Sequence, residues 1–249
     1  MRQERSNASF VQSGHAVRFD WGIDGLRRLG RECAVLVVVD VLSFATAVDM
    51  ATGAGAHVLP LPQEDDRARQ AAEAAGAVLA GPRGESDHSL SPSTLSDVAE
   101  GALIGLPSPN GARLCSVAAE LGAIVFAGCL RNASAVAGAA GAAARNGPVG
   151  VVAAGERRGE HTLRFAVEDV LGAGAVISAL PAEVGSRSVE AETVARSYRN
   201  VSDLRGELRG CESGRELVEW GYGQDVELAC LADVSATAPR LRAGVFSRR

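Results

Sequence analysis

The sequence predicts a three-layer α/β/α fold with a mainly parallel sheet and a helical C-terminal extension, and two observations lead to this prediction. Apolar residues make up 47% of the 249 residues but aromatic residues only 4%, and small side chains let helices pack closely on a sheet. Short apolar runs also alternate with longer Ala-rich segments, which is typical of parallel strands joined by right-handed helical crossovers.

Strands are expected where a short run is continuously apolar, and residues 34–40 (AVLVVVD) are the best example. Their β-branched side chains, without polar alternation, indicate a strand covered on both faces, as in a parallel sheet. By the same reasoning, further strands are expected at residues 57–60, 77–80, 102–106, 123–127 and 149–154. Helices are expected at residues 41–52, 64–76, 112–121, 132–145 and 166–180.

Two segments depart from this alternation. Residues 81–94 form a polar Gly/Pro/Ser loop, and irregular loops of this length are uncommon unless they are functional. Residues 188–233 contain no clear strand and indicate three short helices. Because no repeat or low-complexity linker divides the chain, we expect a single domain over residues 1–249, with an α/β core at 14–185 and a helical extension at 186–249.

Charge and cysteine content exclude several classes of protein. The net charge is −5 and no long basic run occurs, which argues against nucleic-acid binding. No CxxC, HxH or HxxxH pair occurs, so neither a disulfide framework nor a zinc site is expected. No apolar stretch reaches the ~20 residues that span a bilayer, and residues 1–14 do not resemble a signal peptide. We therefore expect a cytoplasmic protein with no membrane partner.

Polar residues cluster directly after the expected strands. Ligands of open α/β sheets bind outside the carboxyl ends of the strands, where helix N-termini offer free backbone N–H groups to anions. Arginines, amides and carboxylates follow four of these strands, which suits a phosphorylated or carboxylated small molecule. The candidate residues are Asp40, Ser43, Thr46, Ser108, Asn110, Gly111, Arg113, Arg131, Asn132, Arg157, Arg164, Glu168 and Asp169.

The candidates also have a purely structural interpretation. Asp40 is placed to cap the following helix, and Asn110 before Gly111 is a common turn pair. Glu168 and Asp169 fall in a first helical turn, where the helix dipole favours acids without any function. The residues by themselves therefore support a small-anion site and no particular reaction.

Seven stretches in a characteristic order carry a family resemblance. They are residues 37–48 (VVVDVLSFATAV), 90–95 (LSPSTL), 106–114 (LPSPNGARL), 128–137 (GCLRNASAVA), 153–156 (AAGE), 163–177 (LRFAVEDVLGAGAVI) and 213–233 (SGRELVEWGYGQDVELACLAD). In these stretches the chain resembles the 2-phosphosulfolactate phosphatase (ComB-like) family. The resemblance implies a Mg²⁺-dependent enzyme that hydrolyses 2-phospho-3-sulfolactate to 3-sulfolactate and phosphate, a step in coenzyme M biosynthesis.

The chain departs from the family pattern at three places. Ser43 stands where the family commonly has an arginine, and serine cannot replace a guanidinium as a bidentate anion ligand. Gly172 stands where a cysteine often follows the ED pair, so no cysteine nucleophile is expected there. The glycine-rich loop is reduced to GPRGE at residues 81–85. These differences bear on the substrate more than on the fold.

The resemblance also implies roles for the candidates, and the cofactor is expected to be Mg²⁺. The expected metal ligands are Asp40, Glu168 and Asp169. Asn110 and Asn132 are expected to hold the phosphoryl oxygens, and Arg131 to neutralise their charge. The other substrate-binding residues are expected to be Ser43, Thr46, Ser108, Gly111, Arg113, Arg157 and Arg164. The nucleophile would be either a Mg²⁺-polarised water or Asp40, and the sequence leaves both open.

Other functions fit the sequence less well. The main alternative is a catalytically weak protein of the same fold that binds an organic phosphate or carboxylate, because Ser43 and the shortened loop differ from the family. A haloacid-dehalogenase-type phosphatase needs a D-x-D motif, and residues 40–42 read DVL. A nucleotide-dependent oxidoreductase lacks its G-x-G-x-x-G after a strand. We expect a homodimer, since dimers lead among homo-oligomers.

Overall fold

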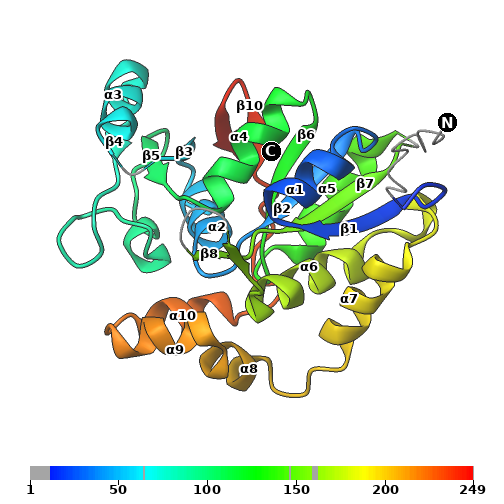
Figure 1. Ribbon diagram of the computed structural model, residues 1–249. Helices are drawn as coiled ribbons and strands as arrows, with labels where there is room; N and C mark the ends of the chain where they lie inside the picture. The colour runs from blue at the N-terminus through cyan, green and yellow to red at the C-terminus, as the bar shows by residue number, and fades with distance from the viewer. Residues whose placement is uncertain (1–11, 64, 146, 159–161, 249) are drawn as a thin grey trace, which may run out of the picture.

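A nine-stranded sheet forms the centre of the computed structural model, which describes residues 12–63, 65–145, 147–158 and 162–248 (Figure 1). Its strand order is β1-β7-β2-β6-β10-β11-β3-β5-β4. The strands are β1 (Val17–Trp21), β2 (Val35–Val39), β3 (His57–Leu61), β4 (Val78–Leu79), β5 (Leu103–Pro107), β6 (Ile124–Gly128), β7 (Val149–Ala153), β10 (Arg240–Arg242) and β11 (Val245–Ser247). A separate two-stranded ribbon consists of β8 (Glu156–Arg158) and β9 (Thr162–Arg164).

Helices cover both faces of this sheet, as the expected three-layer fold requires. One layer consists of α5 (Ala133–Ala144), α6 (Val167–Ala179) and α7 (Val189–Arg199). The other consists of α1 (Gly22–Leu29), α2 (Phe44–Gly53) and α4 (Gly111–Glu120). Side chains of β2 alternate between the two cores, with Val37 in the first and Val38 in the second. Because all of β2 is buried, its sequence has no polar positions.

The remaining helices lie at the margins of these layers. Helix α3 (Asp66–Ala75) packs on β4 and β5, and the 3₁₀ turn η1 (Pro92–Leu95) packs against α2. In the C-terminal region α8 (Leu204–Gly210), α9 (Glu212–Glu219) and α10 (Gly223–Ala229) pack together near α6 (Figure 1). Among the described residues, no helix has the length and apolar character needed to span a bilayer.

The sheet consists of two parallel groups joined by the C-terminal hairpin. Strands β1, β7, β2 and β6 pair in parallel, and so do β3, β5 and β4. Between them the pairings β6–β10, β10–β11 and β11–β3 are all antiparallel, so the second group runs opposite to the first. Strands β1, β7, β2 and β6 therefore end at one edge of the sheet.

Most core elements lie at or near their expected positions, and the differences concern short elements. The sequence did not indicate β1, α1, the β8–β9 ribbon or the β10–β11 hairpin. Four helices rather than three occupy the described part of the extension, and the hairpin beyond α10 belongs to the main sheet. The extension is thus not helical throughout. Strands of three residues are too short to show a period in the sequence.

Gly172 of α6 is expected to be required for packing over β2. A Cβ at this position would lie 2.5 Å from Cγ2 of Val41 and 2.9 Å from Cγ1 of Val39. Gly172→Ala should therefore lower the free energy of unfolding by about 1–3 kcal/mol, measured by urea denaturation. Gly138 of α5 is the matched control: nothing lies within 4 Å of its Cβ position, so alanine there should stabilise by roughly 0.5–1 kcal/mol. Equal effects at both positions would contradict this explanation.

Candidate active site

The buried carboxylate of Asp40, directly after β2, joins two helix N-termini. Its Oδ1 accepts a hydrogen bond from the Phe44 N–H at 3.3 Å, and its Oδ2 accepts one from the Gly111 N–H at 2.8 Å. Phe44 and Gly111 are the first residues of α2 and α4. Gly111 permits this approach because a Cβ there would lie 2.7 Å from Oδ2 of Asp40. Asp40 therefore does have the structural role that a capping residue would have.

Asp169 makes a second link of the same kind. Its Oδ1 accepts from the Val41 N–H at 2.7 Å, and its Oδ2 accepts from the Gly155 N–H at 2.8 Å. These amides follow β2 and β7, so the carboxylate ties the ends of two neighbouring strands together. Neither Asp169 nor the adjacent buried Glu168 lines the cavity beside Asp40.

Four carboxylates gather where β2 and β7 end, and their charges oppose one another. Burial raises the pKa of Asp40 to about 7, and the nearby negative charge of Glu156 is the second cause. Burial also raises the pKa of Asp169 well above its ordinary value, with Asp40 and Glu168 adding to the effect. Oε2 of Glu168 is buried and has no hydrogen-bond partner among the described residues. Protons or a cation are needed to offset this concentration of negative charge.

A cavity of about 370 Å³ opens beside Asp40. Its lining residues are Asp40, Leu42, Ser43, Arg83, Leu90, Ser108, Pro109, Asn110, Glu156, Arg157, Arg164, Ser213, Glu216, Leu217 and Trp220. Nδ2 of Asn110 donates to Oε1 of Glu156 at 3.0 Å, while Oδ1 of Asn110 is buried without a partner among the described residues. The cavity wall thus presents carboxylates, an unpaired amide oxygen and arginines together.

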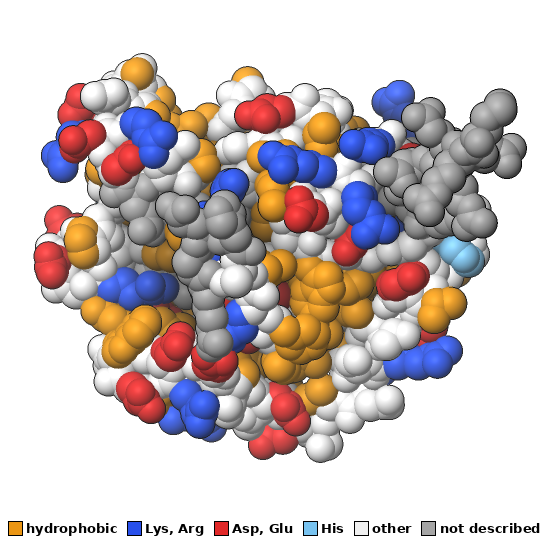
Figure 2. Space-filling view, in the orientation of Figure 1, with side chains coloured by type: hydrophobic (Ala, Val, Ile, Leu, Met, Phe, Trp, Pro, Cys, Tyr) orange, Lys and Arg blue, Asp and Glu red, His pale blue; other side chains and the backbone are white. Residues whose placement is uncertain are grey.

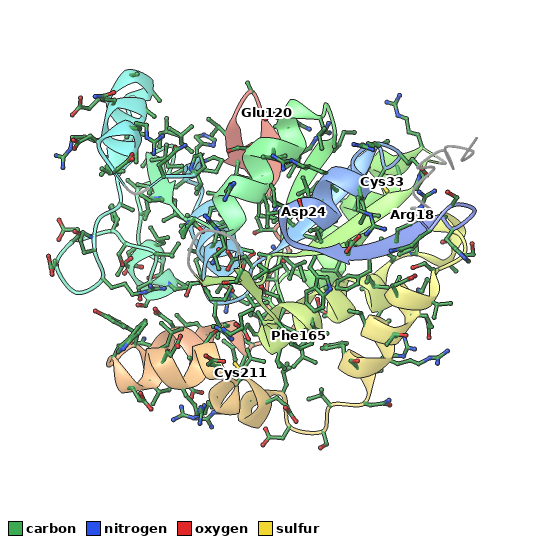
Figure 3. All side chains as sticks on the ribbon, viewed as in Figure 1. Arg18, Asp24, Cys33, Glu120, Phe165 and Cys211 are labelled. Carbon is green, nitrogen blue, oxygen red and sulfur yellow. The ribbon has the colours of Figure 1, made fainter. Side chains whose placement is uncertain are left out.

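A second cavity, of about 300 Å³, adjoins the first and shares Asn110 and Arg157 with it. Its wall is more apolar and includes Trp21, whose ring packs on that of Phe165 with centroids 4.7 Å apart. Hydrophobic side chains gather near the centre of the face in Figure 2, and Figure 3 labels Phe165 in that part of the molecule. The two cavities therefore meet at Asn110 and Arg157.

The structure brings part of the predicted site together. The predicted residues that line the cavity are Asp40, Ser43, Ser108, Asn110, Arg157 and Arg164. Gly111 takes part through its N–H, and Arg113 lines the adjoining cavity. Arg164 is held in place by Ser213, whose Oγ accepts from Nη2 at 2.7 Å.

Three predicted residues lie elsewhere, because each has an internal partner. Nε of Arg131 donates to Asp49 at 3.0 Å and its Nη1 donates to the Leu228 carbonyl at 3.0 Å. Oδ1 of Asn132 accepts from the Cys129 N–H at 2.9 Å, within its own turn. Thr46 donates to the Val41 carbonyl at 2.7 Å. These internal contacts give Arg131, Asn132 and Thr46 structural roles away from the cavity beside Asp40.

Two cavity residues have no role assigned from the sequence. Glu156 ends the AAGE stretch at residues 153–156, and it shares the cavity with Asp40. Arg83 lies in the GPRGE stretch of the long polar loop, and the length of that loop is the signal that could have found it.

Of the predicted metal ligands Asp40, Glu168 and Asp169, the first lines the cavity and the other two do not. No group of three or more His, Cys, Asp or Glu that could hold a metal ion occurs among the described residues. However, Mg²⁺ is usually bound by one or two carboxylates, with water and substrate phosphate oxygens completing its shell. Asp40 and Glu156 fit that requirement, since both line the cavity and the charge of Glu156 helps to raise the pKa of Asp40.

The raised pKa of Asp40 should appear in the pH dependence of stability. The Asp40 carboxyl group keeps its proton up to about pH 7 in the folded protein but releases it near pH 3.8 in the unfolded chain. The stabilising contribution of this proton is therefore present at low pH and is lost as the pH rises from 3.8 to about 7. The free energy of unfolding, measured with urea from pH 4 to 8, should fall by up to about 1.4 kcal/mol per pH unit, and Asp40→Asn should flatten the slope.

Asp65→Asn is the control for this measurement. Asp65 is exposed and its pKa is lowered by Arg67, so its effect falls below pH 4 and the slope between pH 5 and 7 should not change. An identical slope in wild type and Asp40→Asn would show that the Asp40 pKa is not raised.

A family model described as 2-phosphosulpholactate phosphatase matches residues 27–244 of the chain. The match includes every residue that lines the Asp40 cavity, and it confirms the resemblance found in the sequence.

Proposed function

Because the chain belongs to the 2-phosphosulpholactate phosphatase family and is thus a phosphoric monoester hydrolase, we propose that it hydrolyses 2-phospho-3-sulfolactate, or a close phosphorylated hydroxy acid, with the help of Mg²⁺. The observation that carries this proposal is the set of Asp40, Glu156 and Asn110 on one wall of the cavity. A role in coenzyme M biosynthesis follows from the same substrate and belongs to the proposal.

Asp40 and Glu156 are the proposed Mg²⁺ ligands. When bound between them, Mg²⁺ would supply charge neutralisation and polarise the phosphoryl oxygens. Asn110 fixes the position of Glu156 through its Nδ2, which leaves Oδ1 free to accept a hydrogen bond from water or substrate. Gly111 and Phe44 fix the plane of the Asp40 carboxylate through their N–H groups. The acids are thus oriented before the substrate arrives.

Water is the proposed nucleophile. Both oxygens of Asp40 already accept a backbone N–H, and the same carboxylate is assigned to the metal, so it is poorly placed to attack phosphorus. Arg157 and Arg164 take the charge-neutralising role that the sequence suggested for Arg131, since both line the cavity. Arg164 is held by Ser213 and faces Glu212 at 3.7 Å, which keeps its charge near the phosphate.

The purified protein should release inorganic phosphate from 2-phospho-3-sulfolactate with Mg²⁺, and EDTA should abolish the release. Asp40→Asn should reduce kcat by at least about 100-fold, as is common when a group that stabilises transition-state charge is removed. Thermal melting serves as the folding control. Full activity in the variant would remove Asp40 from the mechanism. Tight binding of an organic phosphate without Mg²⁺-dependent release would indicate the small-anion binding protein instead.

The choice of metal ligands can be tested with two isosteric substitutions. Glu156→Gln should raise the Mg²⁺ concentration for half-maximal activity by roughly tenfold or more, because one of two carboxylate ligands becomes neutral. Glu168→Gln is the matched control and should leave that concentration nearly unchanged, since Glu168 does not line the cavity. The reverse result would favour the ligand set predicted from the sequence.

Dimerisation remains a prediction that a light-scattering mass near one chain would contradict.

A further inference from the structure

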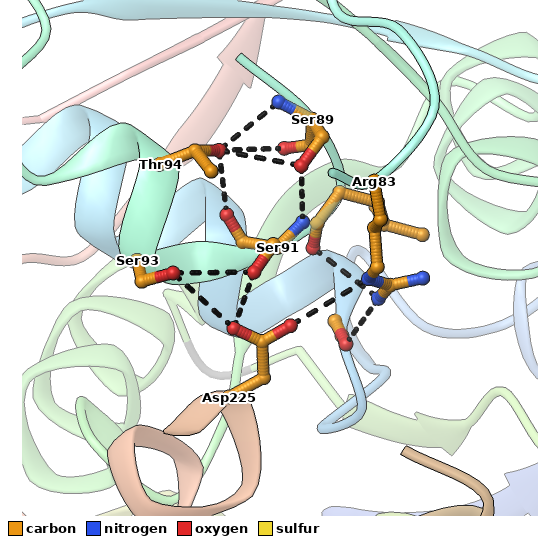
Figure 4. A network of polar contacts seen from close by, with 8 residues as sticks. Arg83, Ser89, Ser91, Ser93, Thr94 and Asp225 are labelled. Carbon is orange, nitrogen blue, oxygen red and sulfur yellow. Dashed lines mark hydrogen bonds and ion pairs between the residues drawn. The ribbon is translucent and has the colours of Figure 1, made fainter. Parts of the chain in front are cut away.

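Arg83, in the GPRGE stretch of the long polar loop, lines the cavity beside Asp40. Its Nη2 donates to Oγ of Ser43 at 2.8 Å and lies 3.5 Å from the Leu90 carbonyl (Figure 4). Its side chain is 21% exposed, and the residue lines the cavity beside Asp40. The guanidinium of Arg83 therefore lies against the very residue that replaces the arginine of the family pattern.

The C-terminal region holds this guanidinium in place. Nε of Arg83 lies 3.5 Å from Oδ2 of the buried Asp225 in α10, and its Cζ lies 5.7 Å from the centroid of the Tyr222 ring. Asp225 in turn accepts hydrogen bonds from Ser91 and, at 3.5 Å, from Ser93 of the same polar loop (Figure 4). A cation fixed by a buried acid and an aromatic face loses little freedom when it binds an anion.

Arg83 and the acidic wall make separate contacts in the cavity. The carboxylate of Asp40 is held by the N–H groups of Phe44 and Gly111. Asn110 likewise bonds to Glu156, whereas Arg83 bonds to Ser43 and Leu90. Among the described residues, the contacts of Arg83 are made by Nη2 and Nε, and Nη1 remains available to a ligand.

We propose that Arg83 binds a second oxyanion group of the substrate, a sulfonate or carboxylate, and supplies from the polar loop the guanidinium that position 43 lacks. This inference rests on the proposed phosphatase function, because it assigns the phosphoryl group to the wall formed by Asp40, Asn110 and Glu156. It makes Arg83 a specificity-determining residue that distinguishes phosphorylated hydroxy acids from simple phosphate monoesters.

The test compares two substrates, 2-phospho-3-sulfolactate and phenyl phosphate, which lacks a second acidic group. Arg83→Ala should raise KM for the sulfonated substrate by roughly 10- to 100-fold, as for the loss of a charge-assisted hydrogen bond, with kcat less affected. The loss of kcat/KM should be at least tenfold greater than for phenyl phosphate. Equal losses on both substrates, or no loss on either, would overturn the proposal.

Two further variants test whether the effect of Arg83→Ala comes from the lost guanidinium charge or from altered folding. Arg196→Ala removes an exposed arginine of α7 that pairs with Glu192, and should leave both substrates unaffected. Ser43→Arg in the Arg83→Ala background returns a guanidinium to this part of the cavity and should recover at least tenfold of the lost kcat/KM on the sulfonated substrate. No recovery in a folded double variant would show that the two positions do not serve one subsite.

Binding of 3-sulfolactate, measured by calorimetry, keeps the inference separate from the proposed function. If wild type releases no phosphate from either substrate, the phosphatase proposal fails. Even then, 3-sulfolactate should bind wild type and bind Arg83→Ala at least tenfold more weakly. Equal affinity for both proteins, or no binding to wild type, would overturn the role of Arg83.

Discussion

The structure around the site depends on one buried carboxylate. Asp40 accepts N–H groups from the first residues of α2 and α4, and so determines where two helices begin relative to the end of β2. Asp169 repeats the arrangement between the ends of β2 and β7. An acid that accepts backbone hydrogen bonds recovers part of its lost hydration, which explains how a protein tolerates such residues in its interior.

Backbone hydrogen bonds replace only part of the hydration that these buried carboxylates lose. Burial and mutual repulsion still raise the pKa values of Asp40 and Asp169, so the folded chain is destabilised when both carboxylates are ionised. Under the proposed function, a divalent cation would relieve the same repulsion between Asp40 and Glu156. Charge repulsion in this site destabilises the folded chain, and a ligand that neutralises it would stabilise the fold. Proteins commonly violate local stability rules at functional positions.

The C-terminal region contributes to the sheet and positions side chains of the cavity. Its hairpin joins the two parallel groups of the sheet, and Ser235 donates to Asp49 at 2.6 Å beside the buried Arg131 pair. Ser213 orders Arg164, and Asp225 orders Arg83. Removing one partner from a buried pair leaves an uncompensated charge, so these contacts couple the folding of the C-terminal helices to the shape of the cavity.

The sequence by itself determined the layered fold, the buried strand β2 and the position of Asp40 at its end, because continuous apolar runs reflect local burial. Its motifs also identified the family. Tertiary structure alone decided which polar residues meet. Arg131 follows β6, at the expected edge, yet its guanidinium reaches the buried Asp49, whereas Arg83 reaches Ser43 from a loop far away in the chain. Which buried partner a charged side chain contacts depends on strand direction and helix packing. Loops and three-residue strands show no sequence pattern from which that packing could be predicted.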